Sequence, residues 1–595
     1  MLNSLKKWIS IKKNKNARLI LLLSIIIFNI LLWLISSILA YIISPNSFGN
    51  VFDALWKTGI AWMLEPGFYN PDVEVPIRII SLIVIITSMI TFTGGIIGYV
   101  GNIFSSVIDN SEKGRGKLYI YDHILILNWN NKALELIADY QYDDLITNIV
   151  ILSSNEKSEI EKLISRKFYE IAEGKKLTKK INIIVREGDV FSRSDLNDVC
   201  IDRAKAVIIL SSEANEEENN IEMRSIKTLM LVSNINISNE QTIIFEARKE
   251  ETLNVISEKI ANNLAIKKHI IPLLPDEMMG RLIAQTILFP EVNNVYQELF
   301  SFKGAEFYTT AEESCEDFML NHNKSIPIYN YDSKLYVLSE GNENINSTRK
   351  TPYNSNRVIK FKEKLSFLDK NIIVFGNNNK LKYILDSIRL YQKDCSSKVN
   401  ITLIESNDAK TINDSIRNLK KIDTILILSE DNLCKDNYDS DVLLTLLMIQ
   451  DIAKIHKSDI IIELLDPKHY DIAQSYNIRN TIISNKYISR IISQLSNNYS
   501  LYYLFHDLLT YDEMDKENGT YEIYTYKAEN LLDEKFPVIF NCRAEIIDSC
   551  YKSSQGDYIV IGLVKNNITD IFKGDLDRKE NISIQPEDII IVISK

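Results

Sequence analysis

Cysteine and histidine are scarce in this chain of 595 residues, and the six cysteines stand far apart without forming a CxxC pair. Because zinc sites are built from closely spaced cysteine and histidine ligands, we predict no zinc site. The scatter also excludes the disulfide framework of a small secreted domain. It is typical of reduced cytosolic thiols.

Charge is missing from two long apolar stretches near the N-terminus. No charged residue occurs between Leu19 and Ile43, and Arg78 is the one charged residue between Ile77 and Val107. A helix over the first stretch would be roughly 37 Å long, which exceeds the ~30 Å hydrocarbon core of a bilayer. We therefore predict transmembrane helices at residues 19–43 and 77–108, both longer than the apolar region of a cleaved signal peptide.

Acidic residues are missing before Asp53, and the charged residues of the loop between the two stretches, residues 44–76, are mostly acidic. Basic residues flank the stretches on their other sides: Lys6, Lys7, Lys12, Lys13, Lys15 and Arg18, then Lys113, Arg115 and Lys117. The positive-inside rule then predicts a multi-pass protein of the cell membrane. Residues 1–18 form a basic cytoplasmic N-terminus, the loop faces outside, and the C-terminus is cytoplasmic.

The formal net charge of the chain is −11. A nucleic-acid-binding protein needs a basic surface to neutralise phosphates, so we expect no nucleic acid among the partners. Lipid and permeating cations are the expected partners of the membrane part.

From His123 onward, short apolar runs alternate with helical patterns. Continuous apolar strands separated by helices indicate a parallel sheet that is covered on both faces. The predicted strands are 123–130, 148–153, 181–185, 206–210 and 242–246, and then 371–376, 400–405, 424–428 and 459–463. We predict α/β architecture after a linker at 109–122: two tandem Rossmann-like domains, 123–360 and 361–595, each with a smaller α+β lobe.

The dinucleotide-binding motif GxGxxG is missing from the turn after the first strand of each domain. Its three glycine positions hold Asn128, Asn130 and Ala133 in the first domain, and Gly376, Asn378 and Leu381 in the second. Bulky side chains would fill the approach of a pyrophosphate to the helix N-terminus. We therefore expect no NAD binding, and no catalytic acid–base group stands beside either turn, so we expect no enzyme.

Four motifs follow one another along the chain: Lys-Gly-Arg-Gly at 113–116, Gly-Arg-Leu-Ile at 280–283, Asp-Ser-Asp at 439–441 and Leu-Asp-Pro at 465–467. Gly188-Asp189 and the stretch from Ile201 to Ala204 add the signature of RCK domains, the regulators of K⁺ conductance. With these motifs, residues 50–595 resemble the CASTOR/POLLUX ion-channel family, although that family usually has glycine in place of Asn128. The resemblance implies a homotetramer with a central pore and a cytoplasmic ring of eight RCK domains. It also implies cation conduction, with K⁺ and Ca²⁺ both proposed as the permeant ion, and regulation by calcium.

Residues 52–63 are long enough for a pore helix, and the filter is expected at Leu64, Glu65, Pro66 and Gly67. The TVGYG filter of K⁺ channels is missing there. The family pattern is an acidic residue with glycine two positions on, and Glu65 stands where Asp is usual. In a tetramer Glu65 would form a ring of carboxylates that attracts cations. The alternative is an exposed Glu-Pro-Gly turn between two helices.

The second predicted span contains polar and small residues that suit a pore. Thr87 and Thr91 would line a wet pore, and Gly94, Gly95 and Gly98 would permit a gating bend. Tight packing of these glycines against the first span is an equally good interpretation.

Two acidic clusters follow the fourth strand of each repeat and are candidate regulatory cation sites. They are Glu213, Glu216, Glu217 and Glu218 in the first repeat, and Asp431, Asp436, Asp439 and Asp441 in the second. Carboxylates are suitable ligands for Ca²⁺, and ligands often bind at the carboxyl ends of parallel strands. Since no EF-hand spacing is present, the alternative is that these acids only cap the helices that follow them.

The sequence thus favours a tetrameric RCK-gated cation channel that is regulated by a divalent cation such as Ca²⁺. Two alternatives stay open. One is a membrane-anchored nucleotide-binding sensor or enzyme without a pore. The other is a K⁺-selective RCK channel with an atypical filter.

Overall fold

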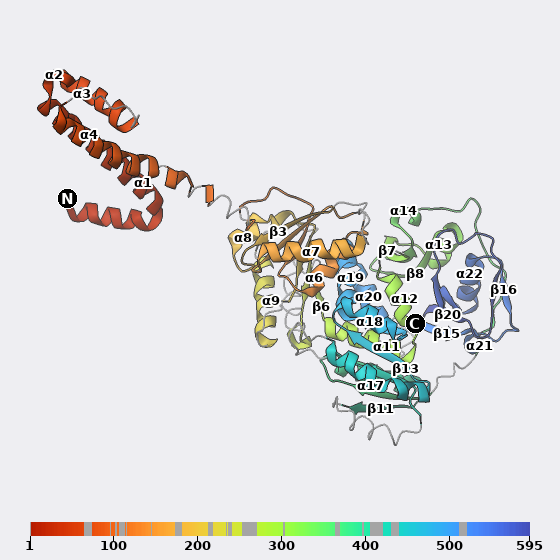
Figure 1. Cartoon of the computed structure of the whole chain (residues 1–595). Coiled ribbons are helices and arrows are strands. Elements are labelled where there is room, and N and C mark those ends of the chain that lie inside the picture. Colours follow the sequence, from red (N-terminus) through yellow and green to blue (C-terminus); the bar gives the residue numbers. More distant parts are fainter. Residues whose placement is uncertain are drawn as a thin grey trace. The chain divides into compact units, whose positions relative to one another are not determined.

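A computed structural model describes residues 2–64, 74–95, 97–101, 104–105, 113–114, 116–143, 145–172, 181–211, 218–233, 235, 241–252, 270–301, 304–362, 369–395, 398–404, 421–429, 439–510 and 521–594. The chain divides into two compact units, Met1–Arg115 and Gly116–Lys595. Figure 1 shows the helical first unit and the α/β second unit, each of which is described by itself.

The first unit consists of helices. In chain order these are α1 (Leu2–Ile43), α2 (Pro45–Phe48), α3 (Val51–Thr58), the π-helix η1 (Gly59–Leu64), α4 (Val75–Ser88) and the π-helix η2 (Met89–Thr93). Two helical segments, Leu23–Ile43 and Val75–Gly101, are long and apolar enough to cross a membrane by length and composition. Ala40, Ala54, Trp62 and Ile77 belong to a small core between the helices. Many outward side chains are apolar, as in Ile27, which is 56% exposed.

The second unit begins with a six-stranded parallel sheet in the order β3-β2-β1-β4-β5-β6. The strands are β1 (Ile124–Leu127), β2 (Asn148–Ser153), β3 (Asn182–Glu187), β4 (Ala206–Ile209), β5 (Thr242–Glu246) and β6 (Ile270–Leu273). The helices between them are α6 (Asn131–Asp139), α7 (Lys157–Ala172), α8 (Arg193–Asp198), η3 (Ile201–Arg203) and α9 (Glu218–Ser233). Every residue of β1 and β4 is buried, because helices cover both faces of the sheet.

A second parallel sheet repeats this arrangement in the order β11-β10-β12-β13-β14. Its strands are β10 (Lys370–Phe375), β11 (Val399–Ile404), β12 (Thr424–Ile427), β13 (Asp459–Leu464) and β14 (Asn480–Ile483). Its helices are α15 (Lys380–Cys395), α17 (Ser440–His456), η5 (Pro467–His469) and α18 (Tyr470–Ser475). The order matches β2-β1-β4-β5-β6 of the first sheet, so the predicted tandem Rossmann-like repeat is confirmed.

Two small lobes complete the second unit. The first is an antiparallel sheet, β7 (Glu306–Ala311), β9 (Lys334–Ser339) and β8 (Ser325–Tyr331), with α13 (Cys315–Asn321) and α14 (Asn342–Ile345). The second has the sheet β15 (Glu522–Lys527), β20 (Ile589–Ser594), β17 (Tyr558–Lys565) and β18 (Ile568–Ile571), and the pair β16 (Val538–Phe540) and β19 (Ile582–Ile584). Its helices are α21 (Ala528–Leu531) and α22 (Arg543–Ser553). These are the α+β lobes that the sequence predicts.

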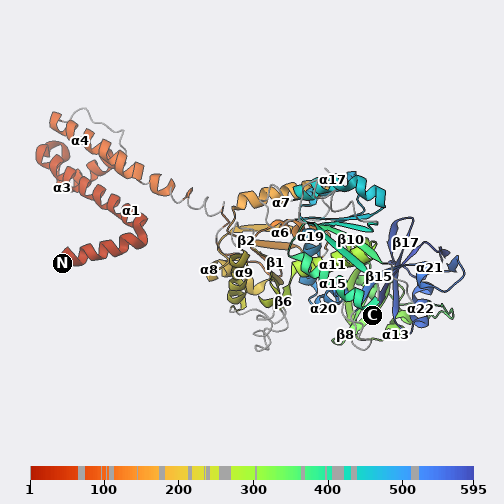
Figure 2. The ribbon, with the colours of Figure 1, turned by 90° about the horizontal axis from the view of Figure 1, so that it is seen from below.

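The two repeats exchange one helix each. The helix after the last strand of the first sheet, α11 (Pro275–Leu288), packs against α15 of the second repeat. Its counterpart after β14, α19 (Ser484–Asn497), packs against α6 of the first repeat. The following helices, α12 (Val292–Leu299) and α20 (Leu501–Leu509), lie in the same shared core. Figure 2 shows α11 beside α15 and α19 beside α6. A boundary between residues 360 and 361 therefore separates the two sheets but leaves each half dependent on a helix from the other.

Candidate functional site

The short helix α3 is fixed against the first predicted span by two polar contacts. Trp33 Nε1 donates a 2.9 Å hydrogen bond to the carbonyl of Leu55. The hydroxyls of Ser37 and Thr58 lie 2.5 Å apart, and both side chains are buried. Gly59 allows this close approach, since a Cβ there would lie 3.0 Å from Trp33 Nε1. Together α3 and η1 cover the segment predicted as a pore helix and lead to Leu64.

The rest of the predicted filter, Glu65, Pro66 and Gly67, lies outside the described residues. The ring of Glu65 carboxylates stays a prediction. The structure does show the segment that leads to this predicted filter, since η1 ends at Leu64, directly before Glu65.

The predicted pore-lining residues of the second span have different surroundings. The Thr91 hydroxyl shares its one proton between Asn29 Oδ1 at 3.0 Å and the carbonyl of Thr87 at 2.7 Å. Thr91 therefore holds the second span against the first, whereas no hydrogen bond is recorded for the half-buried hydroxyl of Thr87 within the described part of the chain.

The three glycines also differ from one another. A Cβ at Gly95 would lie 2.9 Å from Ile25 Cδ1, so this glycine packs tightly against the first span. Gly98 has nothing within 4 Å of its Cβ position, and Gly94 meets only the Met89 carbonyl at 3.9 Å. The π-helical turn η2 ends directly before Gly94. Such turns widen the helix and are frequent at functional sites, so for Gly94 and Gly98 the hinge stays a prediction.

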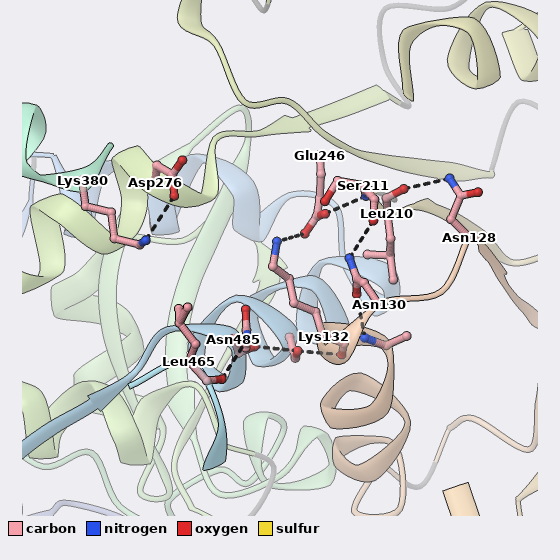
Figure 3. Close-up of polar contacts among 12 residues, drawn as sticks. Asn128, Asn130, Lys132, Leu210, Ser211, Glu246, Asp276, Lys380, Leu465 and Asn485 are labelled. Atoms are coloured by element: carbon pink, nitrogen blue, oxygen red, sulfur yellow. Dashed lines mark hydrogen bonds and ion pairs between the residues drawn. The ribbon is translucent and has the colours of Figure 1, made fainter. Parts of the chain in front are cut away.

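The turn after β1 is closed by its own side chains (Figure 3). Asn128 adopts a left-handed backbone conformation, with φ of 71°, and its amide nitrogen donates to the Leu210 carbonyl at 2.9 Å. Asn130 donates to the Ser211 carbonyl at 2.9 Å, and its Oδ1 caps α6 by accepting from the Ala133 amide. These bonds tie the turn to the end of β4.

An ion pair between a half-buried lysine and a buried glutamate lies next to this turn. Lys132 Nζ is 2.9 Å from Glu246 Oε1, and the other Glu246 oxygen accepts from the Ser211 amide at 2.9 Å. Figure 3 shows this pair beside the Asn130 bond. The glutamate at the end of β5 thus compensates the lysine at the start of α6.

The second repeat carries the same network at the equivalent positions. Asn378 donates to the Ser429 carbonyl at 2.8 Å and to Glu463 at 2.9 Å. Lys380 Nζ lies 3.3 Å from Glu463 Oε1 and 3.4 Å from Asp276 Oδ1 of α11. Gly376 has φ of 85°, and a Cβ there would lie 2.8 Å from the Leu428 carbonyl.

These two networks do not fit a dinucleotide. The asparagine that caps α6 is already bonded to the Ser211 carbonyl, and the lysine of each repeat is neutralised by a glutamate of its own repeat. A pyrophosphate at either turn would have to break the ion pair of a buried glutamate, so the expectation of no NAD binding stays a prediction that this geometry favours.

A shared cleft lies between the two networks. Its volume is about 160 Å³, and its lining includes Lys132, Arg248, Asp276 and Lys380. The exchanged helices close it: Asn485 of α19 donates to the Leu465 carbonyl at 2.9 Å, and Asp276 of α11 contacts Lys380. The two repeats therefore meet at the carboxyl ends of their sheets.

The exchanged helices make equivalent contacts at Gly280 and Ser489. A Cβ at Gly280 would lie 2.8 Å from the Lys380 carbonyl, so only glycine allows α11 this close to α15. Ser489 Oγ donates to the Lys132 carbonyl at 2.9 Å. Further along the same contact, burial raises the pKa of Asp139 to about 7, although Arg490 lies 3.8 Å away and opposes this shift.

The acidic clusters are described only in part. Glu213, Glu216, Glu217, Asp431 and Asp436 lie outside the described residues. Glu218 is the first residue of α9, and the half-buried Asp441 lies in the first turn of α17. Among the described residues, no group of three or more histidine, cysteine, aspartate or glutamate side chains has the arrangement of a metal site.

Asp439 has a structural role. It is fully buried, and its carboxylate accepts from the amides of Leu465 and Asp466, each at 2.9 Å. It also lies 3.0 Å from His469 Nδ1. The Ser429 hydroxyl donates to the same carboxylate at 3.2 Å, so its oxygens join the segment after β12 to the turn after β13. With four contacts in all, this buried carboxylate has little left to offer a cation.

Comparison with known proteins agrees with this fold. The family model of the calcium-activated potassium channel slowpoke-like RCK domain matches residues 128–246. The probable ion channel POLLUX of rice (Oryza sativa subsp. japonica) is 20% identical over 663 residues, covering 96% of this chain and 65% of that protein. The probable ion channel CASTOR of rice is 20% identical over 576 residues, covering 81% of this chain and 62% of that protein.

The homologues of this chain are ion channels of the POLLUX and CASTOR type. The predicted resemblance is confirmed, and the homologues are named as ion channels rather than enzymes, in agreement with the expectation of no enzyme. The chain spans less than two thirds of the length of these relatives. Among solved structures, the human SLO3 gating ring is similar with a TM-score of 0.53 at 12% identity, covering 80% of this chain and 99% of that one. This likeness shows the fold.

Sequence reasoning missed the paired Lys–Glu networks, although a signal was present. An Asn-x-Lys pattern follows the first strand in both repeats, at 130–132 and 378–380. In both, the strand after the acidic cluster ends in glutamate, Glu246 and Glu463. A shared lysine after one strand and a shared glutamate at the end of another indicate an ion pair at the same edge of a parallel sheet.

Proposed function

We propose that this chain is the subunit of a cation channel whose pore is opened by its own α/β module. The observation that carries the proposal is the combination in one chain of two parts. A pair of membrane-length helices encloses a short helix fixed to the first of them, and a tandem RCK-type repeat follows. The POLLUX and CASTOR homologues, which are named ion channels, support it.

The proposed assembly is a homotetramer in the cell membrane, with a ring of eight RCK domains on the cytoplasmic side. The basic flanks of both spans support this orientation. The segment α3–η1 then enters the outer half of the membrane, and Glu65 of each subunit contributes to a ring of four carboxylates. Such a ring attracts K⁺ and Ca²⁺ and repels anions.

Gating follows from a population shift between two ring states. A ligand that binds one state more tightly biases the pore by that difference in affinity. The contacts of α11 with α15 and of α19 with α6 are the natural place for such a change, since they join the two repeats. At the pore, the π-turn Met89–Thr93 and Gly94 supply the bend.

We propose Ca²⁺ as the regulatory ligand, held by the acidic clusters at Glu213–Glu218 and Asp431–Asp441. Asp439 is left out of the ligand set because its oxygens are already bonded. A titration of the purified protein with Ca²⁺ tests this: we expect a change in open probability that Asp431→Asn with Asp436→Asn weakens. An open probability that Ca²⁺ leaves unchanged contradicts the calcium proposal but not the channel.

The channel itself is tested by recording the purified full chain in planar bilayers. We expect unitary currents and a reversal potential that favours cations over Cl⁻. Glu65→Gln should lower the permeability of Ca²⁺ relative to K⁺ several-fold, because the ring loses its charge. The matched control is Glu74→Gln, which removes an exposed carboxylate of the same loop at the start of α4.

Two results would contradict the proposal. If the reconstituted chain passes no current while it binds a nucleotide, the membrane-anchored sensor is the better interpretation. If Glu65→Gln and Glu74→Gln leave the permeability ratio equally unchanged, Glu65 is an exposed turn residue and the filter lies elsewhere. A K⁺-selective current would keep the channel and exclude Ca²⁺ permeation.

A further inference from the structure

A second and larger cavity lies away from the shared cleft. Its volume is about 420 Å³, which is within the range of small-molecule sites. Three parts of the chain line it: the segment after α6 with Asp143, the strand β7 with the loop after β9, and the end of α19 with Gln494. It therefore joins the first repeat, its small lobe and the helix that the second repeat contributes.

The charged side chains among the described residues that line this cavity are all acidic. Its lining includes Asp143, Glu306, Glu340 and Glu343, and none of the described residues that line it is a lysine, arginine or histidine. Asp143 is buried at the base, where its carboxylate accepts from the Leu145 amide and from the Asn497 side chain. Glu340 and Glu343 are exposed at the rim, and neither has an ion-pair partner among the described residues. Outside the lining, Lys205 Nζ donates to Asn497 Oδ1 at 2.8 Å and is attracted by the charge of Asp143.

One buried acceptor in the lining has no donor. Gln494 is 3% exposed, its amide nitrogen donates to the Leu299 carbonyl, and its Oε1 receives no hydrogen bond. A buried acceptor without a partner carries a desolvation cost that a ligand N–H would remove. The cavity thus offers acceptors and negative charge to a ligand that brings donors and positive charge.

Aromatic rings complete the lining. Tyr308 stands half-buried with its hydroxyl 3.0 Å from Glu306, and burial together with the nearby carboxylates of Glu306, Glu343 and Asp143 raises its pKa, so it stays a neutral phenol. Tyr142 also lines the cavity. Tyrosine faces attract ammonium groups through their quadrupole.

These features favour an organic cation over a bare metal ion. Direct binding of a divalent metal needs several carboxylates that converge on one point, and no such group of three occurs among the described residues. A volume of about 420 Å³ exceeds the space of a single ion and accommodates a flexible chain.

We propose that this cavity binds a linear polyamine, with one ammonium group at Asp143 and Gln494 and others at the rim carboxylates Glu340 and Glu343. Such a ligand would bridge the first repeat and α19 of the second. Its effect on the pore rests on the proposed function, because bridging the repeats would bias the ring toward one state. The proposed binding of the polyamine does not depend on the proposed channel function.

Calorimetry on the purified full chain in detergent tests the binding, with spermidine as the probe at physiological ionic strength. We expect saturable binding and weakening of about tenfold in Glu340→Gln with Glu343→Gln, because two charge-assisted contacts are lost. The matched control is Glu312→Gln with Glu316→Gln, which removes the same charge from exposed positions outside the cavity. Gln494→Leu should weaken spermidine as well, without any change in net charge.

Three results would overturn the proposal. One is a loss of spermidine affinity that is equal in the two double variants, Glu340→Gln with Glu343→Gln and Glu312→Gln with Glu316→Gln. This result would mean that spermidine is attracted to the acidic surface in general. Another is binding of Mg²⁺ or Ca²⁺ that depends on Glu340 and Glu343 while spermidine does not bind, which makes this an inorganic cation site. The third is binding of 1,4-butanediol as tight as that of putrescine, which shows that charge is not recognised. Calorimetry needs no current, so failure of the channel proposal and failure of this one are distinguishable.

Discussion

Thr91 and Asn29 join the two predicted spans by a side-chain hydrogen bond, in which Thr91 Oγ1 donates to Asn29 Oδ1 at 3.0 Å. Asn29 is 3% exposed, and its amide nitrogen donates to the Ile25 carbonyl one turn earlier. In an apolar surrounding, such polar contacts orient helices because few other partners are present. The rotation of the second span about its axis is therefore tied to the first.

Thr91→Val should loosen this helix pair. The substitution keeps the shape of the side chain and removes the donor, so we expect a loss of about 1 kcal/mol and a lower melting temperature in detergent. Thr87→Val, one turn earlier, is the control and should change little. Equal effects of the two would mean that the helix pair does not depend on the Asn29 contact.

Gly280→Ala should separate α11 from α15. The new Cβ would lie 2.8 Å from the Lys380 carbonyl and 2.8 Å from Tyr383 Cβ, so the helices must move apart. Overpacking of this kind costs about 1–3 kcal/mol. Thermal unfolding of the full chain measures it, and Ser489→Ala at the equivalent position of α19 should cost less, since a Cβ already fits there. A Gly280→Ala protein as stable as the parent would show that the contact is not tight.

Lys380→Met should be among the most destabilising substitutions in the module. It leaves Glu463, which is 0% exposed, without its cation, and an uncompensated buried charge costs about 3–5 kcal/mol. Trp129 is the one tryptophan after residue 115, so its fluorescence in increasing urea reports the unfolding of the α/β module. Adding Glu463→Gln should restore much of the stability.

Lys382→Met is the matched control for that experiment. Its partner Glu250 and Lys382 itself are both more than half exposed, and such pairs contribute about 0–1 kcal/mol. If Lys380→Met were as mild as Lys382→Met, Glu463 would have to be protonated in the folded protein.

Asp139 should make the module less stable as the pH rises. Burial raises the pKa of its carboxyl in the folded state from 3.8 to about 7, so the unfolded chain releases this proton first. The contribution of Asp139 is therefore fully present below pH ~4 and is lost as the pH rises toward 7, by a few kcal/mol. We expect Asp139→Asn to abolish this part of the pH dependence. The urea midpoints of both proteins at pH 5 and pH 8 check this prediction. It is contradicted if the two proteins differ in midpoint by the same amount at both pH values.

Much of the fold could be predicted because parallel strands are buried on both faces. Ile124–Leu127 and residues 425–427 are continuous apolar runs, and each is found in a strand at the predicted place. The strands β6 and β14 escaped prediction because Pro272 interrupts the first and Asn480-Thr481 begins the second, so neither has the usual pattern.

The exchange of α11 and α19 could not be predicted, because local patterns show that a helix is amphipathic but not which repeat its apolar face contacts. Gly280 was visible in the sequence as a motif residue, and its meaning became clear only with the Lys380 carbonyl beside it. Asp439 is the reverse case. An acidic residue after a parallel strand suggested a cation ligand, and the folded chain uses it to hold two backbone amides.

The exchanged helices have a consequence for the origin and the division of this chain. In a protein made of one repeat, the helix equivalent to α6 or α15 would lack the helix that covers it. A second copy of the protein would have to supply that missing helix. The tandem chain thus holds in one polypeptide the pairing that two single-repeat chains would form by exchanging this helix. Two separately produced halves, cut near residue 361, should accordingly find each other in solution and assemble into one body.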